Sequence, residues 1–176
     1  MPKGFYSSIN RATGYNPCPV GEYNDEFGAT SCKDAPLGYY TDELNSTDVK
    51  PIPPGYFYPT KGCTGNYQAC NPGYYSTGNA TSCSPVPGGY YNDKSAASNF
   101  TACRAGEYST GAATACTLVP AGYFNNQSAQ STYFACPSGT FSELGSTNCT
   151  KCPKGSYANI SGTEFCSIVS PVNNII

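Results

Sequence analysis

Residues 70–83 read CNPGYYSTGNATSC. Here a cysteine precedes a glycine by three residues, two tyrosines follow the glycine, and a second cysteine lies ten residues after it. Glycine accepts the positive φ of a tight turn, and aromatic residues favour short strands. Because turn-forming residues separate the tyrosines from the second cysteine, this stretch predicts a small hairpin closed by a disulfide.

The same framework recurs along the chain, and its register is set by the glycine before the aromatic residue. This glycine returns in steps of 16, 17 or 18 residues, at Gly4, Gly21, Gly38, Gly55, Gly73, Gly89, Gly106, Gly122, Gly139 and Gly155. Such a period is typical of a repeat protein in which each repeat packs on its neighbours. The sequence therefore predicts ten tandem cysteine-rich, aromatic repeats within 1–168: 1–17, 18–35, 36–52, 53–69, 70–85, 86–102, 103–118, 119–135, 136–151 and 152–168.

The repeats are of two kinds, with and without a cysteine pair. Five of them carry one cysteine three residues before the glycine and another ten or eleven residues after it. A disulfide that closes a loop of this length contributes roughly 3 kcal/mol in the chain-entropy model. We expect these pairs to form disulfides: Cys18 with Cys32, Cys70 with Cys83, Cys103 with Cys116, Cys136 with Cys149, and Cys152 with Cys166.

The composition agrees with a chain that lacks a large aliphatic core. It contains 11 Cys, 19 Gly, 15 Pro and 16 Tyr, no Trp, and only 11% charged residues. Such a chain needs covalent cross-links for its stability. We expect a small, disulfide-rich, all-β protein, built as an elongated tandem array of about 17-residue units with short strands, turns and almost no helix. Stacked repeats would share a thin core of tyrosines and disulfides.

Cysteine content and glycosylation sequons both indicate an extracellular or cell-surface location. Eleven cysteines in a polar, Gly/Pro-rich chain are typical of an oxidising compartment. Six Asn-x-Ser/Thr sequons predict N-glycans, at Asn45, Asn79, Asn99, Asn126, Asn148 and Asn159. The net charge of −2 gives no support for nucleic-acid binding. Because the sequence has no long apolar run, we expect no membrane span in this segment. We expect a piece of a longer array, with 169–176 starting a further linker or repeat.

Cys63 is left over when the five pairs are formed. Three interpretations stay open: a disulfide to another chain, a free or capped thiol, or a bond to Cys70 that displaces Cys83. The last would disrupt the most regular pair in the chain.

The sequence predicts no catalytic centre, metal site or cofactor. It has no histidine, which removes the commonest general base and metal ligand. Its single C-x-x-C motif, Cys149 to Cys152, is better explained as a junction between two repeats than as half of a zinc or redox site. The acidic stretches 23–26 and 41–44, with Asp48 nearby, lack a calcium-loop pattern and are better explained as solvated turns. We therefore do not expect an enzyme.

Aromatic residues supply the candidate contact surface. Neighbouring residues of a strand point to opposite faces, so one aromatic of each adjacent pair should face outward. We expect the second aromatic to form this outward row, at Tyr40, Tyr75, Tyr91 and Phe124, where it would contact a neighbouring chain or the inner sugar of a glycan. The first 44 residues carry no sequon and are a second candidate contact surface.

The cysteine-bearing repeats, such as CPSGTFSELGSTNCTKCPKGSYANISGTEFC at 136–166, resemble ephrin-receptor-like cysteine-rich repeats. They are also similar to the first half of the cysteine-rich modules of tumour-necrosis-factor receptors. The resemblance implies short strands, disulfides within repeats and an elongated extracellular array, as in large surface or fibre proteins of protists and algae. This chain departs from the pattern, because its cysteine-bearing repeats alternate with cysteine-free ones. The additional cysteines of the receptor modules are absent here.

Two functions are compatible with these features. The first is a structural component of an extracellular glycosylated filament, stalk or surface coat, built by self-association of repeat rods. The alternative is an adhesin or receptor-like ectodomain that binds a protein or glycan along the array. A filament should use the same surface in every repeat, whereas a receptor should have one or two repeats with unusual exposed residues. The near-uniform repeats favour the filament.

Overall fold

The computed structural model describes residues 1–9 and 14–169, and within these ranges it contains strands and turns but no helix. The strands are each two residues long and pair as antiparallel hairpins, one in each predicted repeat. The small disulfide-rich all-β tandem array predicted from the sequence is confirmed. The hairpins are β1 (Phe5–Tyr6) with β2 (Asn16–Pro17), β3 (Glu22–Tyr23) with β4 (Lys33–Asp34), β5 (Tyr39–Tyr40) with β6 (Lys50–Pro51), β7 (Tyr56–Phe57) with β8 (Gln68–Ala69), β9 (Tyr74–Tyr75) with β10 (Ser84–Pro85), β11 (Tyr90–Tyr91) with β12 (Thr101–Ala102), β13 (Glu107–Tyr108) with β14 (Thr117–Leu118), β15 (Tyr123–Phe124) with β16 (Phe134–Ala135), β17 (Thr140–Phe141) with β18 (Thr150–Lys151), and β19 (Ser156–Tyr157) with β20 (Ser167–Ile168).

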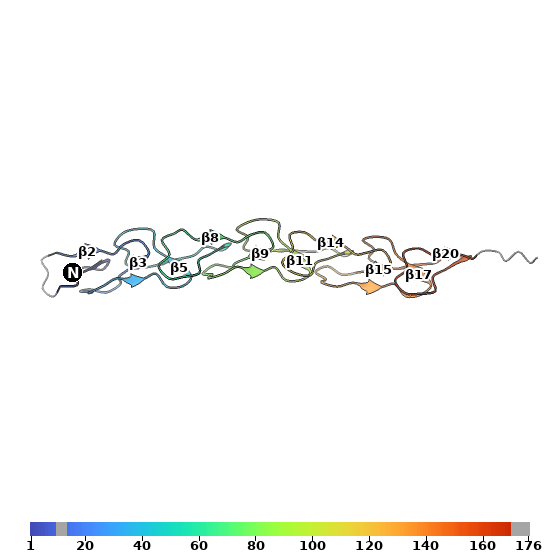
Figure 1. The fold of residues 1–176 in the computed structure, drawn as a ribbon, viewed down its shortest axis with the longest axis horizontal. Coiled ribbons are helices and arrows are strands. Elements are labelled where there is room, and N and C mark those ends of the chain that lie inside the picture. The colour runs from blue at the N-terminus through green and yellow to red at the C-terminus, as the bar shows by residue number, and fades with distance from the viewer. Residues whose placement is uncertain (10–13, 170–176) are drawn as a thin grey trace, which may run out of the picture. The chain divides into compact units, whose positions relative to one another are not determined.

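The hairpins are grouped in two compact units. The first comprises Met1–Pro85 with Lys94–Asn99, and the second comprises Val86–Asp93 with Phe100–Ile176. Within each unit the hairpins follow one another in chain order (Figure 1). The predicted linker at 169–176 falls, beyond Val169, outside the described residues.

Each hairpin starts with a turn that requires the repeat glycine. In repeat 3 the Tyr39 amide donates to the Pro36 carbonyl at 3.1 Å, and Gly38 between them has a φ of +81°. This is the geometry of a type II turn, in which the third residue needs a positive φ. A close approach adds to the requirement, because a Cβ atom on Gly21 would lie 2.7 Å from the Gly62 carbonyl oxygen, two repeats further on.

A second positive-φ turn lies in the loop of each of repeats 2–10. Glycine fills it in several repeats, but alanine or asparagine does so in others, where the left-handed conformation costs more. The residues at this position are Gly28, Asn45, Gly62, Asn79, Ala96, Ala112, Ala129, Gly145 and Gly162.

Backbone hydrogen bonds join each repeat to the next. The Gly21 amide of repeat 2 donates to the Thr41 carbonyl of repeat 3 at 3.0 Å. In return, the Asn45 amide of repeat 3 donates to the Cys18 carbonyl of repeat 2 at 2.9 Å. The equivalent bonds between repeats 7 and 8 run from Gly106 to Asn125 and from Ala129 to Cys103, both at 2.8 Å. Main-chain groups therefore hold neighbouring repeats together, largely independently of side-chain identity.

Apart from Cys63, the buried side chains of the described residues occupy two positions in the repeat. One lies three residues before the glycine and holds cysteine or a small aliphatic residue: Cys18, Ala35, Ile52, Cys70, Val86, Cys103, Val119 and Cys136. The other lies three residues after the glycine and is usually a small polar residue: Asn24, Thr41, Ser76, Asn92, Ser109, Asn125 and Ser142. Among the described residues every buried side-chain nitrogen or oxygen has a hydrogen-bond partner.

The prediction of a tyrosine core is therefore wrong. No aromatic side chain in the described ranges is fully buried. The interior position is closed in by main chain from neighbouring repeats, which leaves space for a cysteine or valine but not for a ring. The aromatic residues lie at the rim instead.

Five disulfides cross-link the array within repeats. They join the cysteines that share a repeat register, each with a Cα–Cα distance of 5.6 or 5.7 Å, which is within the usual range. The bonds are Cys18–Cys32, Cys70–Cys83, Cys103–Cys116, Cys136–Cys149 and Cys152–Cys166.

Candidate functional site

Aromatic side chains at the rims of neighbouring repeats pack on one another. Tyr67 of repeat 4 lies between Tyr40 of repeat 3 and Tyr56 of its own repeat, with ring centroids 5.2 Å from each. Both contacts are edge-to-face, a favoured arrangement of aromatic rings. Burial raises the pKa of the Tyr67 phenol, and the neighbouring Tyr40 raises it further. In repeat 8, Tyr133 has the same place between Tyr108 and Tyr123.

These contacts change the interpretation of the predicted outward row. Tyr40, Tyr75, Tyr91 and Phe124 are all half-buried. In the pair Tyr74–Tyr75, Tyr74 is the more exposed member, at 40%, so exposure does not single out Tyr75 as the outward residue. A two-residue strand has neighbouring loops and rings on both faces, so strand alternation alone does not turn one side chain fully outward. Phe124, for example, has its ring centroid 6.0 Å from that of Phe134.

The six sequon asparagines are all exposed. Asn45 and Asn79 share the left-handed turn position, each with a φ of 52°. The other four, Asn99, Asn126, Asn148 and Asn159, lie elsewhere in their repeats. Each sequon asparagine is therefore accessible to a modifying enzyme or an attached glycan.

Cys63 is a free cysteine with a fully buried side chain. It cannot pair with Cys70 in this structure, because Cys70 is bonded to Cys83. Cys63 directly follows the left-handed turn residue of its repeat, Gly62. The equivalent position holds alanine in other repeats, such as Ala80 and Ala97. The Cys63 carbonyl accepts a hydrogen bond from the Thr41 amide at 3.0 Å. The thiol therefore fills a small-residue position between repeats, which corresponds to the free-thiol interpretation.

The acidic stretches are engaged by lysines. Lys33 Nζ lies 2.8 Å from Asp25 and 2.6 Å from Glu26, and Lys50 repeats this arrangement with Asp42 at 2.7 Å and Glu43 at 3.3 Å. The hydrogen bond from Lys33 lowers the pKa of the Asp25 carboxyl below its ordinary value, and Asp25 and Glu26 together raise the pKa of Lys33. These side chains are solvent-exposed, so each ion pair contributes little.

The C-x-x-C motif joins two repeats. Cys149 is bonded to Cys136 of repeat 9, and Cys152 is bonded to Cys166 of repeat 10. Neither thiol is available as a metal ligand or redox group in this state. Within residues 1–9 and 14–169, no group of three or more His, Cys, Asp or Glu side chains is placed to hold a metal ion.

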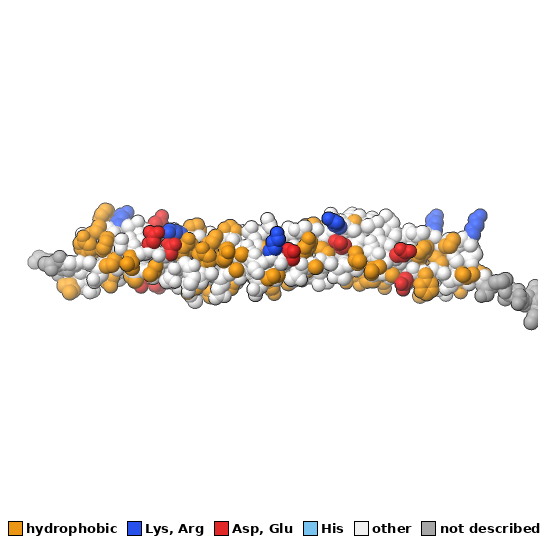
Figure 2. All heavy atoms as spheres, turned by 90° about the horizontal axis from the view of Figure 1, so that it is seen from above, with side chains coloured by type: hydrophobic (Ala, Val, Ile, Leu, Met, Phe, Trp, Pro, Cys, Tyr) orange, Lys and Arg blue, Asp and Glu red, His pale blue; other side chains and the backbone are white. Residues whose placement is uncertain are grey.

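Exposed apolar side chains are frequent in the segment without sequons. They include Phe27 at 77% and Leu44 at 58% exposed, which lie immediately before the left-handed turns of repeats 2 and 3. Lys3 covers part of the Phe27 ring, with its Nζ 5.6 Å from the centroid. On the face shown in Figure 2, charged side chains are few and lie among hydrophobic and uncharged polar ones. The described chain contains no long apolar helix of the kind that crosses a membrane.

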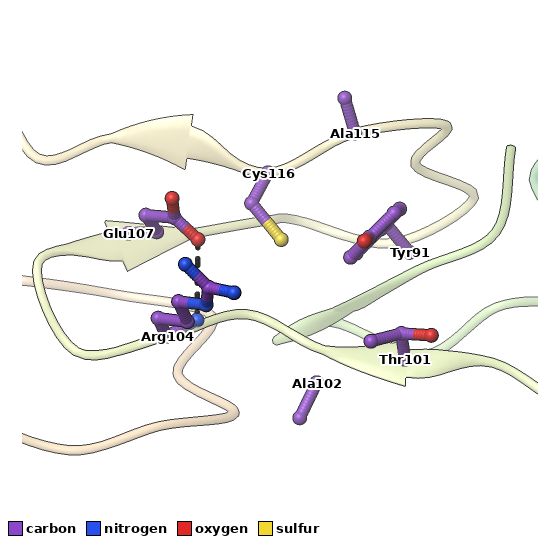
Figure 3. A pocket seen from close by; sticks show the side chains of 7 residues that line it. All are labelled: Tyr91, Thr101, Ala102, Arg104, Glu107, Ala115 and Cys116. Atoms are coloured by element: carbon purple, nitrogen blue, oxygen red, sulfur yellow. Dashed lines mark hydrogen bonds between the residues drawn. The ribbon is translucent and has the colours of Figure 1, made fainter.

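A hollow of about 350 Å³ lies where repeat 6 meets repeat 7, within the second compact unit (Figure 3). Figure 3 shows Arg104 and Glu107 on one side of it, Tyr91 and Thr101 on the other, and Cys116 between them. The backbone amide of Arg104 donates to Glu107 Oε2 at 3.2 Å. From this group, sequence reasoning selected Tyr91 as a contact residue and Cys116 as a disulfide cysteine. The signal that it missed is Arg104, which replaces the proline of most other repeats.

Comparison with known families adds to this geometry. Residues 4–51 match the family model described as "Tyrosine-protein kinase ephrin type A/B receptor-like". Together with the disulfide-rich all-β array, this match supports an ephrin-receptor-like cysteine-rich repeat in this segment. It comprises nearly all of repeats 1–3, so the match includes two cysteine-free repeats, 1 and 3, as well as the Cys18–Cys32 pair. A search of curated proteins found no match to the chain.

The ephrin-receptor-like match and the disulfides point to the same general setting. Ephrin-receptor-like repeats are modules of extracellular, receptor-like or surface proteins, and disulfides persist in oxidising compartments. An extracellular module fits both observations.

Proposed function

We propose that this chain is a non-catalytic structural component of an extracellular, N-glycosylated filament, stalk or surface coat, built by self-association of ephrin-receptor-like arrays. The observation that carries this proposal is the repetition of the same backbone contacts between neighbouring repeats. Repeats joined in the same way present equivalent surfaces at a regular interval, which suits assembly with further copies.

The proposed mechanism is mechanical. Main-chain hydrogen bonds between repeats resist separation of the hairpins, and the five disulfides limit how far any cysteine-bearing repeat can unravel. Glycans on the exposed sequon asparagines would keep the array soluble and obstruct proteases. The absence of histidine from the sequence supports a non-catalytic function.

The contact surface proposed for self-association is the exposed apolar group of the segment without sequons. We use the part of this group that lies in repeats 2 and 3, namely Val20, Phe27, Leu37 and Leu44. Burial of such side chains against another copy would stabilise an assembly by about 25 cal/mol per Å² of apolar surface.

Size-exclusion chromatography with light scattering, followed by negative-stain electron microscopy, tests this proposal on the secreted, glycosylated chain. We expect concentration-dependent association that Leu44→Ser weakens. Leu144→Ser is the matched control, because Leu144 is also exposed and also precedes a left-handed turn residue, Gly145. Monomers at every concentration, or equal effects of the two substitutions, would contradict self-association through this surface.

The alternative is an adhesin or receptor-like ectodomain that binds a protein or glycan along the array. The ephrin-receptor-like match at 4–51 favours it. A pull-down with the immobilised chain on extracellular glycans and proteins distinguishes the two functions. Saturable binding of one ligand by a monomeric chain would support the receptor, whereas assembly without a ligand would support the filament.

A further inference from the structure

Aromatic pairs close the cysteine-free repeats at the place where disulfides close the others. In the cysteine-bearing repeats, the second cysteine lies ten or eleven residues after the repeat glycine. In four of the five repeats without a cysteine pair, an aromatic residue lies eleven or twelve residues after that glycine. Its ring packs edge-to-face on the aromatic residue that directly follows the glycine, with centroids 4.9 to 5.2 Å apart. These pairs are Phe5–Tyr15, Tyr56–Tyr67, Tyr90–Phe100 and Tyr123–Tyr133.

In two of these repeats, a tyrosine of the preceding repeat packs on the same closing ring. Tyr40 of repeat 3 contacts Tyr67 with ring centroids 5.2 Å apart, and Tyr108 of repeat 7 contacts Tyr133 at 4.8 Å. The first pair lies within the first compact unit and the second pair within the second unit. All four rings are half-buried. Neighbouring repeats are therefore joined ring to ring by residues that each carry a phenol.

The phenols of Tyr40 and Tyr67 also interact with each other. Burial raises the pKa of the Tyr67 phenol, and the Tyr40 phenol raises it further, which places the two hydroxyl-bearing ends near one another. The carbons ortho to the hydroxyl groups are the atoms that couple when two tyrosines are oxidised. The contact thus brings together the reactive parts of the two rings.

Oxidative coupling of two phenols is a balanced reaction with a peroxide. Each phenol loses one electron and one proton, and the two tyrosyl radicals form a carbon–carbon bond between their ortho carbons. The hydrogen on each of these carbons then moves to the ring oxygen through solvent, which restores two aromatic phenols. One molecule of hydrogen peroxide accepts the two electrons and two protons and becomes two molecules of water. The product is dityrosine, which is two hydrogens lighter than the two tyrosines.

The contacts favour coupling within one chain over coupling between chains. Linked groups that meet in this way have an effective concentration on the order of millimolar or more, whereas a dilute solution of chains is micromolar. An oxidising compartment, indicated by the disulfides, is also the setting in which such a bond persists.

The two pairs bridge stretches of chain that no disulfide spans. In the described residues, the longest stretch between successive disulfides is 33–69, which contains both Tyr40 and Tyr67. Tyr133 lies in the stretch 117–135, between the Cys103–Cys116 and Cys136–Cys149 disulfides. The five disulfides each join cysteines of one repeat, so a bond between these tyrosines would add covalent links between repeats.

We propose that Tyr67 is oxidatively coupled to Tyr40 by a peroxide and an extracellular peroxidase, forming a dityrosine cross-link between repeats 3 and 4. Tyr133 is coupled to Tyr108 in the same way, between repeats 7 and 8. Both cross-links form within one chain and require no contact with a second copy. The inference is therefore independent of the proposed self-association.

The chain contains its own controls for this chemistry. The pairs Phe5–Tyr15 and Tyr90–Phe100 have the same edge-to-face contact, but phenylalanine has no hydroxyl group and forms no phenoxyl radical. Tyr157 is 47% exposed, so it is more accessible to an oxidant than the half-buried rings. It separates coupling that depends on exposure from coupling that depends on contact.

The test treats the secreted, glycosylated chain at micromolar concentration with hydrogen peroxide and a haem peroxidase. Dityrosine fluorescence measures the yield, and mass spectrometry of a protease digest identifies the coupled residues. We expect monomer-sized products that contain the bonds Tyr40–Tyr67 and Tyr108–Tyr133. Tyr67→Phe should abolish the first bond alone, and Tyr133→Phe the second alone, because each substitution keeps the ring and removes the hydroxyl group. Tyr157→Phe should leave both bonds unchanged.

Thermal unfolding of the coupled monomer provides a second measurement. A cross-link that restricts the unfolded chain should raise the thermal midpoint by roughly 5–15 °C, and the double variant Tyr67→Phe/Tyr133→Phe should show no such rise after the same treatment. Lack of intrachain dityrosine, or an equal yield in the double variant, would overturn the inference. So would coupling confined to Tyr157, or an unchanged thermal midpoint. Bonds of Tyr67 to Tyr56, or of Tyr133 to Tyr123, would overturn the link between repeats.

Discussion

Cysteine-bearing and cysteine-free repeats fill the same interior position in two ways. In repeat 7 this position holds Cys103, bonded to Cys116, and in the next repeat it holds Val119. Both side chains are 0% exposed. Their backbone amides both donate to the glycine of the preceding repeat, Cys103 to Gly89 at 2.8 Å and Val119 to Gly106 at 2.9 Å.

The difference shows that the disulfide is not what shapes the hairpin. The backbone network is the same with and without it, so the turn glycines and the main-chain hydrogen bonds define the repeat. The disulfide adds stability chiefly by restricting the unfolded chain, whereas valine adds it by removing apolar surface from water.

The turn glycines should matter most, in both kinds of repeat. Gly122 has a φ of +85°, and a Cβ atom there would lie 2.6 Å from the Gly162 carbonyl carbon. Gly122→Ala should therefore cost about 3 kcal/mol or more in free energy of unfolding. Gly139 has a φ of +81° but nothing within 4 Å of the Cβ position, so Gly139→Ala should cost only about 1 kcal/mol. Urea unfolding measures both costs, and equal losses would show that the contact between repeats is unimportant.

Removal of a disulfide should have the next largest effect. Replacing Cys103 and Cys116 together by alanine should cost about 3 kcal/mol, because the unfolded chain gains freedom. Replacing Cys103 by valine and Cys116 by serine copies the interior of repeat 8 and should recover part of that loss. Thermal unfolding compares the two double variants. If valine is no better than alanine, the two kinds of repeat do not share one interior position.

The buried polar position should contribute less than a disulfide. Asn125 Nδ2 donates to the Glu107 carbonyl of the preceding repeat at 2.8 Å, and Asn125 is 1% exposed. Asn125→Ala should cost about 1–2 kcal/mol, because a partly buried carbonyl loses its hydrogen-bond donor. The exposed neighbour supplies the control: Asn126→Ala, in unglycosylated protein, should change stability by less than about 0.5 kcal/mol. Similar losses from both would mean that the buried hydrogen bond adds nothing.

Cys63 should be replaceable but unreactive. Alanine occupies its position in other repeats, so Cys63→Ala should cost less than about 1 kcal/mol. Because the thiol is 0% exposed, iodoacetamide should modify it only after denaturation. The chain should also migrate as a monomer on non-reducing electrophoresis. Rapid native labelling or a dimer band lost on reduction would contradict the buried, free thiol.

The lysine–carboxylate pairs should have the smallest effect, visible only as a pH dependence. The pKa of Asp25 is lowered in the folded chain from its ordinary value of 3.8. Its contribution to folding stability is therefore present above pH 3.8 and is lost as the pH falls below that value. Lys33 has a raised pKa, and its contribution is lost as the pH rises above its ordinary 10.5. Asp25→Asn should slightly reduce the difference in thermal midpoint between pH 7 and pH 3. Asp48→Asn is the control, since Asp48 has no lysine partner in the described chain.

Much of the architecture was predictable because its determinants are local and repeated. Glycine before an aromatic residue indicates each turn, and a shared register indicates each cysteine pair. The buried positions were harder to predict. Ala35, Ile52, Val86 and Val119 stand in register with the interior cysteines, and this correspondence was the available signal. Tyrosine was instead expected inside because of its abundance, although a ring is too large for the space between repeats.

The candidate site shows the same division. Tyr91 was predictable as an aromatic at the rim. The hollow was not, because Tyr91 and Arg104 come from successive repeats and border one space only after those repeats pack together.

The repeat, the positions of its turns, the cysteine register and the lack of helix follow from local sequence, because each depends on residues that are neighbours in the chain. The packing of the repeats is needed to explain which side chains are interior, why alanine is held in left-handed turns such as that of Ala129, and why Cys63 is buried. These outcomes depend on contacts with the next repeat or the one after it. The Ala129 amide, for example, donates to the Cys103 carbonyl of the preceding repeat, and this bond compensates for a backbone conformation that alanine alone would avoid.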